Sequence, residues 1–147
     1  MEYLEQPSTD IWIKRQEWVE GRLLQFEEQG SYLVSEQACA LIGEVQICFC
    51  AGAWISVIVL AFTVIDAQLR ETEVPGFKGD SKRLLSTLGF DDRFQKLRER
   101  RNRIIHIKED QPAINVDQQW ANRRELEIEA REAVELMLEA FFSNPGV

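Results

Sequence analysis

The sequence predicts an all-α protein, an up-and-down helical bundle of about five to six helices in one domain that takes in residues 1–147. Apolar residues recur at three- and four-residue spacing in the long segments, whereas no segment shows the alternating pattern of a strand. Capping residues and glycines bracket these segments. The chain has 147 residues, 45% of them hydrophobic, with eight Phe and four Trp. It can therefore bury a substantial core.

The first helix is expected from about residue 10 to residue 28. Ser8 or Asp10 can cap it, because both side chains accept hydrogen bonds from the free amides of a first helical turn. Gly30 follows as a stop signal. Apolar residues recur at helical spacing: Trp12, Val19, Leu23 and Phe26. They predict one apolar stripe that packs on the rest of the domain.

Two central helices are expected over residues 32–48 and 53–71. The second of these is apolar nearly all round, which predicts a position inside the bundle. Residues 47–65 carry no charge over 19 positions, a length that also suits a membrane span. Gly52 interrupts this stretch, however, and no Lys or Arg cluster flanks it to set an orientation. We therefore expect two buried helices and no contact with a membrane.

The C-terminal half is expected to hold a short helix and two longer ones. Residues 74–79 contain one proline and two glycines and predict a loop. Asp80 can cap a short helix through Leu88, and Asp91 or Asp92 can cap the next, which runs to about His106. After a loop around Pro112, the last helix is expected over residues 117–142.

The charge is unevenly distributed along the chain. The net charge of −8 argues against indiscriminate binding of the whole surface to nucleic acid or to an anionic membrane. Residues 93–108 hold seven of the 17 basic residues and one of the 25 acidic residues, a local +6. The rest of the chain has ten basic and 24 acidic residues, or −14. Positive charge is therefore confined to one short segment.

The cysteines predict neither a disulfide framework nor a metal site. Cys39, Cys48 and Cys50 are odd in number and lie in apolar sequence, which fits a reducing, cytoplasmic location. With a single distant histidine, the Cys48–Cys50 pair has no set of four zinc ligands. The acidic N-terminus also lacks the features of a signal peptide. We expect buried, inert thiols, no metal and no cofactor.

The basic segment surrounds His106, the single histidine of the chain. At about 100° per residue, Asn102 and His106 lie one turn apart on nearly the same helix face, and Arg101 is long enough to reach a ligand near the ring. Arginine forms paired hydrogen bonds with phosphate oxygens, and histidine moves a proton near neutral pH. These three side chains therefore suit the chemistry of a phosphodiester.

Here the sequence resembles the HEPN domain (higher eukaryotes and prokaryotes nucleotide-binding). The motif of that family is an arginine, four to six residues and a histidine, commonly with a polar residue directly after the arginine. Residues 101–106 read RNRIIH and match it. Residues 48–71, CFCAGAWISVIVLAFTVIDAQLRE, look like the second core helix of the family. The resemblance covers about residues 35–142, on which the first helix would pack.

The resemblance implies a metal-independent endoribonuclease, since many HEPN domains cleave RNA as homodimers whose two motifs face each other. Many are toxins or act in defence, and the partner that the family suggests is a nucleotidyltransferase-like antitoxin. By this likeness Arg101 stabilises the phosphate, His106 transfers a proton, and Asn102 holds the histidine ring or the phosphate. One histidine serves one proton-transfer role at a time, so symmetric pairing would supply the second.

Three neighbouring features are also expected to take part. Arg98 and Arg103 are candidate contacts to the RNA backbone. Asp66 would orient a motif residue, or it lies at the surface without a role. Apolar positions flanking the motif are candidates for the dimer contact: Phe94, Ile104 and Ile107.

Two other interpretations stay open. In the first, the chain is a non-catalytic HEPN-like module that binds a nucleotide or RNA, or that dimerises. In the second, the basic run is a solvated helix face paired with Asp91, Asp92 and Glu99, and the histidine merely caps a helix.

Overall fold

The computed structural model describes residues 3–146, and these residues form seven α-helices, two isolated β-bridges and no strand. The all-α prediction is confirmed, with one helix more than the upper limit predicted. The helices are α1 (Thr9–Glu27), α2 (Glu36–Ala51), α3 (Trp54–Thr72), α4 (Ser81–Thr87), α5 (Asp92–Ile105), α6 (Val116–Ala121) and α7 (Arg123–Phe141).

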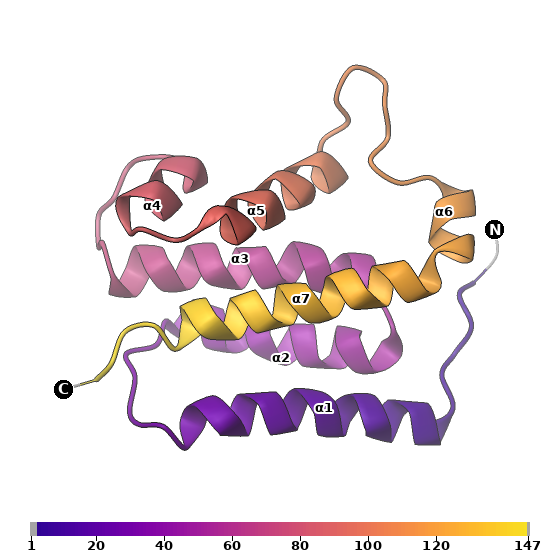
Figure 1. The fold of residues 1–147 in the computed structure, drawn as a ribbon, viewed down its shortest axis with the longest axis horizontal. Helices are drawn as coiled ribbons and strands as arrows, with labels where there is room; N and C mark the ends of the chain where they lie inside the picture. Colours follow the sequence, from indigo (N-terminus) through magenta and orange to yellow (C-terminus); the bar gives the residue numbers. More distant parts are fainter. Residues whose placement is uncertain (1–2, 147) are drawn as a thin grey trace.

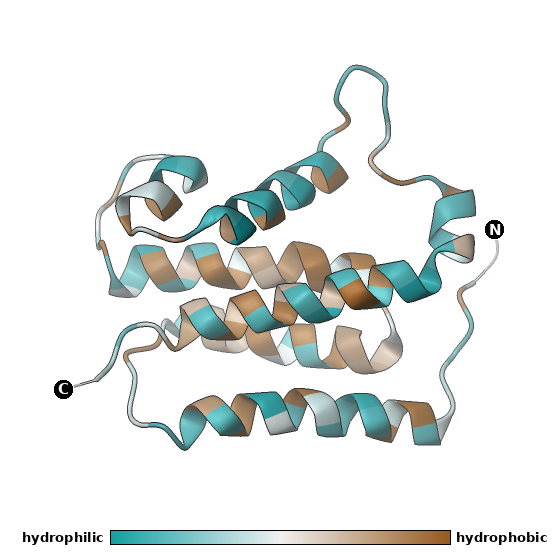
Figure 2. Cartoon of the chain, viewed as in Figure 1, coloured by the Kyte–Doolittle hydropathy of each residue, from teal (hydrophilic) through white to brown (hydrophobic). Residues whose placement is uncertain are grey.

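α3 is the centre of the bundle. It packs against α2, α4, α5 and α7, and nine of its residues are buried. α1 and the α4–α5 pair lie on opposite sides of the α2–α3–α7 group (Figure 1). Figure 2 shows α3 as largely hydrophobic, with hydrophilic residues mainly toward its C-terminal end. Between residues 54 and 65 only Ser56 is exposed, which confirms that this segment is buried on most sides.

The chain turns sharply between α2 and α3 at Gly52. This residue has φ of 76°, a left-handed conformation that glycine adopts without steric cost. Its N–H donates to the carbonyl of Phe49, and the N–H of Ala53 donates to that of Cys48. The uncharged stretch over residues 47–65 is therefore divided between two helices. Among the described residues, no helix combines the length and apolar character that a membrane crossing requires.

α2 begins at Glu36, four residues later than predicted. Residues 31–35 instead pair with the C-terminal segment, where Tyr32 forms an antiparallel bridge with Pro145. The buried side chain of Gln68 accepts from the N–H of Ser35 at 2.8 Å and donates to the carbonyl of Leu33 at 2.9 Å. Hydrogen bonds to distant residues thus replace the helical ones that the local pattern predicts.

The last predicted helix is two helices that join at Asn122. α6 begins with a capping box formed by Asn115 and Gln118. Asn122 has φ of −102° and ψ of 34°, so it ends α6 and precedes the first residue of α7. The next side chain, Arg123, donates to the carbonyl of Gly52. This contact across the bundle holds α7 in a direction that differs from that of α6.

α4 and α5 begin where the sequence predicts. Asp80 accepts from the N–H of Arg83, and Asp91 accepts from the N–H of Arg93. α5 packs on α3 through Phe94 and Leu97. Phe94 is only 1% exposed, so its prediction as a dimer contact is wrong. It belongs to the core of the protomer.

The thiols differ in their surroundings. Cys50 is buried and Cys48 is half-buried, as expected, and none of the three is in a disulfide. Cys39 is exposed, so the prediction of a buried thiol is wrong at this position. Cys50 is directed toward α1.

Candidate functional site

The Arg–His motif lies at the C-terminal end of α5. The helix ends at Ile105, and His106 is its C-cap in an extended conformation, with its N–H bonded to the carbonyl of Asn102 at 2.9 Å. The imidazole is exposed. The following loop projects from the bundle (Figure 1) and closes in a turn where Lys108 pairs with Gln111. His106 therefore stands at the junction of a packed helix and an open loop.

Asn102, Arg103 and His106 line one surface hollow. Its volume is about 400 Å³, and Ile107 and Lys108 complete its lining. A second hollow, of about 540 Å³, adjoins it, and Asn102, Arg103 and Lys108 line both. The remaining residues of the second hollow are Arg98, Glu99, Glu109 and Gln111. We call these two hollows together the α5 site.

Arg101 points elsewhere. Its guanidinium carbon lies 4.8 Å from the centroid of the Phe62 ring of α3, and it lines neither hollow of the α5 site. Burial lowers the pKa of Arg101, the charge of Asp66 raises it and that of Arg98 lowers it further. The Nε atom is buried and has no hydrogen-bond partner. The structure thus brings Asn102 and His106 to one surface but leaves Arg101 on the neighbouring face.

Asp66 is held by other partners. Its two oxygens accept from Arg70 Nε and from Ser81 Oγ, both at 2.8 Å. It acts on Arg101 through its charge rather than through a hydrogen bond. Asp66 thereby joins α3 to the start of α4, next to the helix that carries the motif.

The basic run divides into a paired half and a free half. Ion pairs join Arg93 to Asp91 and Glu139, Lys96 to Asp92, Arg98 to Glu99, and Arg100 to Glu129. Within residues 3–146, Arg101, Arg103 and Lys108 have no ion pair. The interpretation as a solvated, paired face therefore describes Arg93 and Lys96, whereas Arg98 and Arg100 are paired but only partly exposed. The cations near His106 remain available for an external anion.

Arg98 is less accessible to an RNA backbone than the sequence suggests. Its side chain is only 15% exposed, and its Nε donates to Gln95 at 3.0 Å. Its guanidinium still lines the α5 site. Of the two arginines expected to contact RNA, Arg103 is the exposed one.

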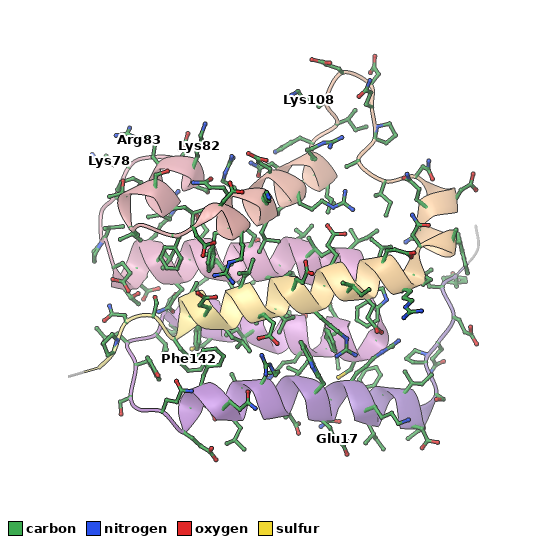
Figure 3. The ribbon with its side chains drawn as sticks, viewed as in Figure 1. Glu17, Lys78, Lys82, Arg83, Lys108 and Phe142 are labelled. Atoms are coloured by element: carbon green, nitrogen blue, oxygen red, sulfur yellow. The ribbon has the colours of Figure 1, made fainter. Side chains whose placement is uncertain are left out.

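A basic cluster on and before α4 escaped the sequence interpretation. Lys78, Lys82 and Arg83 are exposed and form no ion pair in the described part of the chain. Figure 3 shows these three side chains directed outward along the edge where Lys108 also projects. Gln95 of α5 donates to the carbonyl of Lys82 at 3.0 Å and so joins the two helices. The sequence signal for this cluster is three cations within the six residues 78–83.

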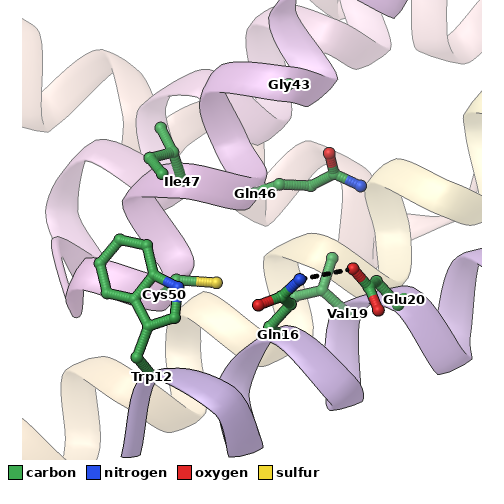
Figure 4. Close-up of a pocket in the computed structure, with 8 residues that line it drawn as sticks. All are labelled: Trp12, Gln16, Val19, Glu20, Gly43, Gln46, Ile47 and Cys50. Atoms are coloured by element: carbon green, nitrogen blue, oxygen red, sulfur yellow. Dashed lines mark hydrogen bonds between the residues drawn. The ribbon is translucent and has the colours of Figure 1, made fainter. Parts of the chain in front are cut away.

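A separate hollow of about 240 Å³ lies between α1 and α2 (Figure 4). Gln16 donates to Glu20 there at 2.9 Å, and the thiol of Cys50 lies across from them. Burial raises the pKa of Cys50, and the nearby charge of Arg15 opposes this only in part. The thiol thus stays protonated near neutral pH, so this hollow offers no activated nucleophile.

Comparisons of the chain with models of known protein families, with curated proteins and with solved structures found no match. Among residues 3–146, no three His, Cys, Asp or Glu side chains gather closely enough to hold a metal ion. The likeness to the HEPN domain therefore rests on the residues of the motif and of the central apolar helix.

Proposed function

We propose that the chain is a metal-independent endoribonuclease of the HEPN type that acts as a homodimer. The observation that supports this most is the composition of the α5 site. An exposed imidazole, an amide and two unpaired cations line a pair of hollows at the end of one helix. Imidazole and cations are the groups that cleavage of RNA through its own 2′-hydroxyl requires.

The reaction follows from these groups. A neutral imidazole takes the proton of the ribose 2′-hydroxyl while that oxygen attacks phosphorus. The bond to the 5′-oxygen breaks, and an imidazolium donates the proton that this oxygen needs. Arg103 and Lys108 stabilise the negative charge that develops on the phosphate, and Arg101 adds a paired contact once its guanidinium meets the strand. The products are a 2′,3′-cyclic phosphate and a 5′-hydroxyl.

The homodimer supplies the second imidazole. One chain has one histidine, and a two-fold axis beside His106 would bring two of them together. Ile105 and Ile107 are exposed next to the motif and would be covered by a second copy. Ile104 is half-buried and would contact the partner only through part of its side chain.

The charge distribution favours a short RNA contact. Residues outside 93–108 carry a net −14, which would repel a long strand laid across the whole surface. Lys108 of the α5 site lies along the same edge as Lys78, Lys82 and Arg83 (Figure 3). A single-stranded segment along this edge is the substrate that we infer. A toxin role, restrained by a nucleotidyltransferase-like antitoxin, is the biological setting that the resemblance suggests.

The second candidate is a non-catalytic module that binds RNA or a nucleotide, or that dimerises. The orientation of Arg101 favours it, since its guanidinium lies over Phe62 instead of in the α5 site. No hydrogen bond joins the side chains of Asn102 and His106 within the described residues. In this role α5 would hold a phosphate without positioning it for cleavage.

Cleavage of single-stranded RNA in the presence of a chelator tests the proposal. The wild type should leave 2′,3′-cyclic phosphate ends. His106→Ala should lower the rate by about 10²–10⁴, the typical contribution of a general acid or base. Arg101→Lys should also lose activity, because a point charge lacks the two-pronged contact with phosphate oxygens.

Lys96→Ala is the matched control. It removes a charge from the same helix, but the ammonium is already paired with Asp92 at 3.2 Å, and it lies outside the α5 site. Its activity should equal that of the wild type. Equal cleavage by all four proteins would indicate a contaminating nuclease. RNA binding without cleavage by any of them would favour the non-catalytic module.

A further inference from the structure

Another hollow lies apart from the α5 site and shares no lining residue with it. It has a volume of about 700 Å³ and opens where α1, the α2–α3 turn and the α6–α7 junction meet. Figure 1 shows these three segments together at one end of the bundle, with the N-terminal arm beside them. Its charged and aromatic lining residues are Glu5, Arg15, Trp54, Trp120, Arg123, Arg124 and Glu127.

Two guanidinium groups converge on this hollow from different helices. Arg15 of α1 donates to the carbonyl of Cys50 at 3.2 Å and lies 4.7 Å from the centroid of the Trp54 ring. Arg123 of α7 donates to the carbonyl of Gly52. Each donation uses one of the five N–H groups of an arginine. The other N–H groups of both side chains have no acceptor among residues 3–146, and neither side chain has a buried unpartnered nitrogen.

The positive charge here exceeds the negative charge. Three arginines, Arg15, Arg123 and Arg124, line the hollow against two carboxylates, Glu5 and Glu127. Glu127 Oε1 lies 3.9 Å from Arg15 Nη2 and its Oε2 lies 3.6 Å from Arg131 Nε, so two guanidinium groups share this carboxylate. Burial lowers the pKa of Arg15, the charge of Glu127 opposes this in part, and the charge of Arg131 lowers the pKa further. Burial likewise lowers the pKa of Arg123, the charge of Arg15 adds to the effect, and the charge of Glu127 opposes it in part. Partly buried positive charges that lie close together are stabilised when an anion pairs with them.

The surroundings add further groups that suit an organic anion. α3 and α7 both begin at this hollow, and neither first turn has a side-chain cap, so amide N–H groups are free there. Arg124 is exposed on the wall, and no ion pair in the described residues involves it. Trp120 is 39% exposed and offers a ring face to a planar group.

Capping of α2 explains only part of this arrangement. The carbonyls of Cys50 and Gly52 lie at the C-terminal end of α2, where positive side chains are favourable. That contact accounts for one donor from Arg15 and one from Arg123. It does not account for Arg124, for Trp120 or for the volume of the hollow, which lies within the range of small-molecule sites.

We propose that this hollow binds a small organic phosphate that carries an aromatic ring, such as a nucleoside monophosphate. Arg15, Arg123 and Arg124 bind the phosphate, and Trp120 stacks on the ring. The site is independent of the proposed ribonuclease activity, because no residue of the α5 site lines it.

Calorimetric titration of the full chain with AMP tests this proposal, with adenosine and inorganic phosphate as separate probes. AMP should bind more tightly than either fragment. Arg124→Ala should weaken AMP binding at least tenfold by removing a phosphate contact, and Trp120→Ala should weaken AMP binding without changing the affinity for inorganic phosphate. Both residues are exposed, so the fold should survive, which circular dichroism checks.

His106→Ala is the matched control and should bind AMP like the wild type. Absence of AMP binding, or unchanged affinity in both the Arg124 and the Trp120 variants, would overturn the proposal. Loss of AMP binding in His106→Ala would also overturn it, since the ligand would then occupy the α5 site. These outcomes are separate from RNA cleavage, which tests the proposed function alone.

Discussion

Arg101 and Phe62 form a cation–π contact between α5 and α3, with the guanidinium carbon 4.8 Å from the ring centroid. The neighbouring Arg100 makes ordinary polar contacts instead, donating to Glu129 from Nε at 2.5 Å and to the carbonyl of Ala113 at 3.2 Å. These two adjacent arginines of α5 therefore differ in how they bind the helix to its neighbours. Arg100 fastens α5 to α7, whereas Arg101 keeps a buried Nε without a partner.

Arg101→Met should destabilise the fold much less than Arg100→Met. The lowered pKa of Arg101 means that its positive charge is less favourable in the folded state. Arginine titrates only above about pH 12, so this cost is present at every working pH and disappears only on substitution. The guanidinium is only partly buried, so solvent screens much of this cost, and loss of the contact with Phe62 acts in the opposite direction. Arg101→Met should therefore change the free energy of unfolding by less than about 1 kcal/mol. Arg100→Met should lower it by about 1–3 kcal/mol by leaving Glu129 unpaired.

Denaturant unfolding at neutral pH measures both changes. A loss of stability in Arg101→Met as large as that in Arg100→Met would show that Arg101 is a structural residue. An unchanged stability together with lost RNA cleavage would mark it as a residue kept for function.

Ile107→Asp should convert the expected homodimer into a monomer. Ile107 is 73% exposed beside His106, and a buried carboxylate without a partner would oppose association there. Ile128→Asp is the control, since Ile128 is 51% exposed on α7 and lines neither hollow of the α5 site. Light scattering after size exclusion gives the mass of each protein. A monomeric wild type, or a dimer that survives Ile107→Asp and fails with Ile128→Asp, would contradict the predicted interface.

Gly52→Ala should destabilise the fold by about 1–3 kcal/mol. The residue has φ of 76°, and a Cβ atom there would lie 2.9 Å from Arg15 Nη1. Gly21→Ala is the matched control within α1, where nothing lies within 4 Å of an added Cβ, and it should stabilise by about 0.5–1 kcal/mol. The midpoint temperatures of thermal unfolding of the two variants, compared with that of the wild type, measure both effects. A neutral Gly52→Ala would mean that the turn adopts another conformation.

Gln68→Leu should destabilise by about 2–4 kcal/mol, because it leaves the buried N–H of Ser35 without a partner and removes the donor to the carbonyl of Leu33. Gln68 itself is fully buried. Gln37→Leu, at an exposed position of α2, should change stability by less than about 0.5 kcal/mol. Denaturant unfolding measures both changes. Equal effects of the two substitutions would show that the contact between Gln68 and the segment before α2 does not stabilise the fold.

The sequence by itself determined the features that depend on near neighbours in the chain. Helical periodicity places most of the helices, and the caps at Ser8, Asp80 and Asp91 each act within three residues. The turn at Gly52 is equally local, since a left-handed conformation suits glycine. The position of His106 at a helix end follows from the same short-range signals.

Only the tertiary structure decided which side chains meet across the bundle. The late start of α2 depends on Gln68 and on the C-terminal segment, and the break at Asn122 accompanies a contact between Arg123 and Gly52. The burial of Phe94, the ion pairs of Arg93 with Glu139 and of Arg100 with Glu129, and the turn of Arg101 toward Phe62 likewise depend on neighbouring elements. These partners are far apart in the chain, and Phe62 and Arg101 are separated by 39 positions. Periodicity shows that a helix has a buried face, but packing against specific neighbours selects which polar groups are paired and which stay free.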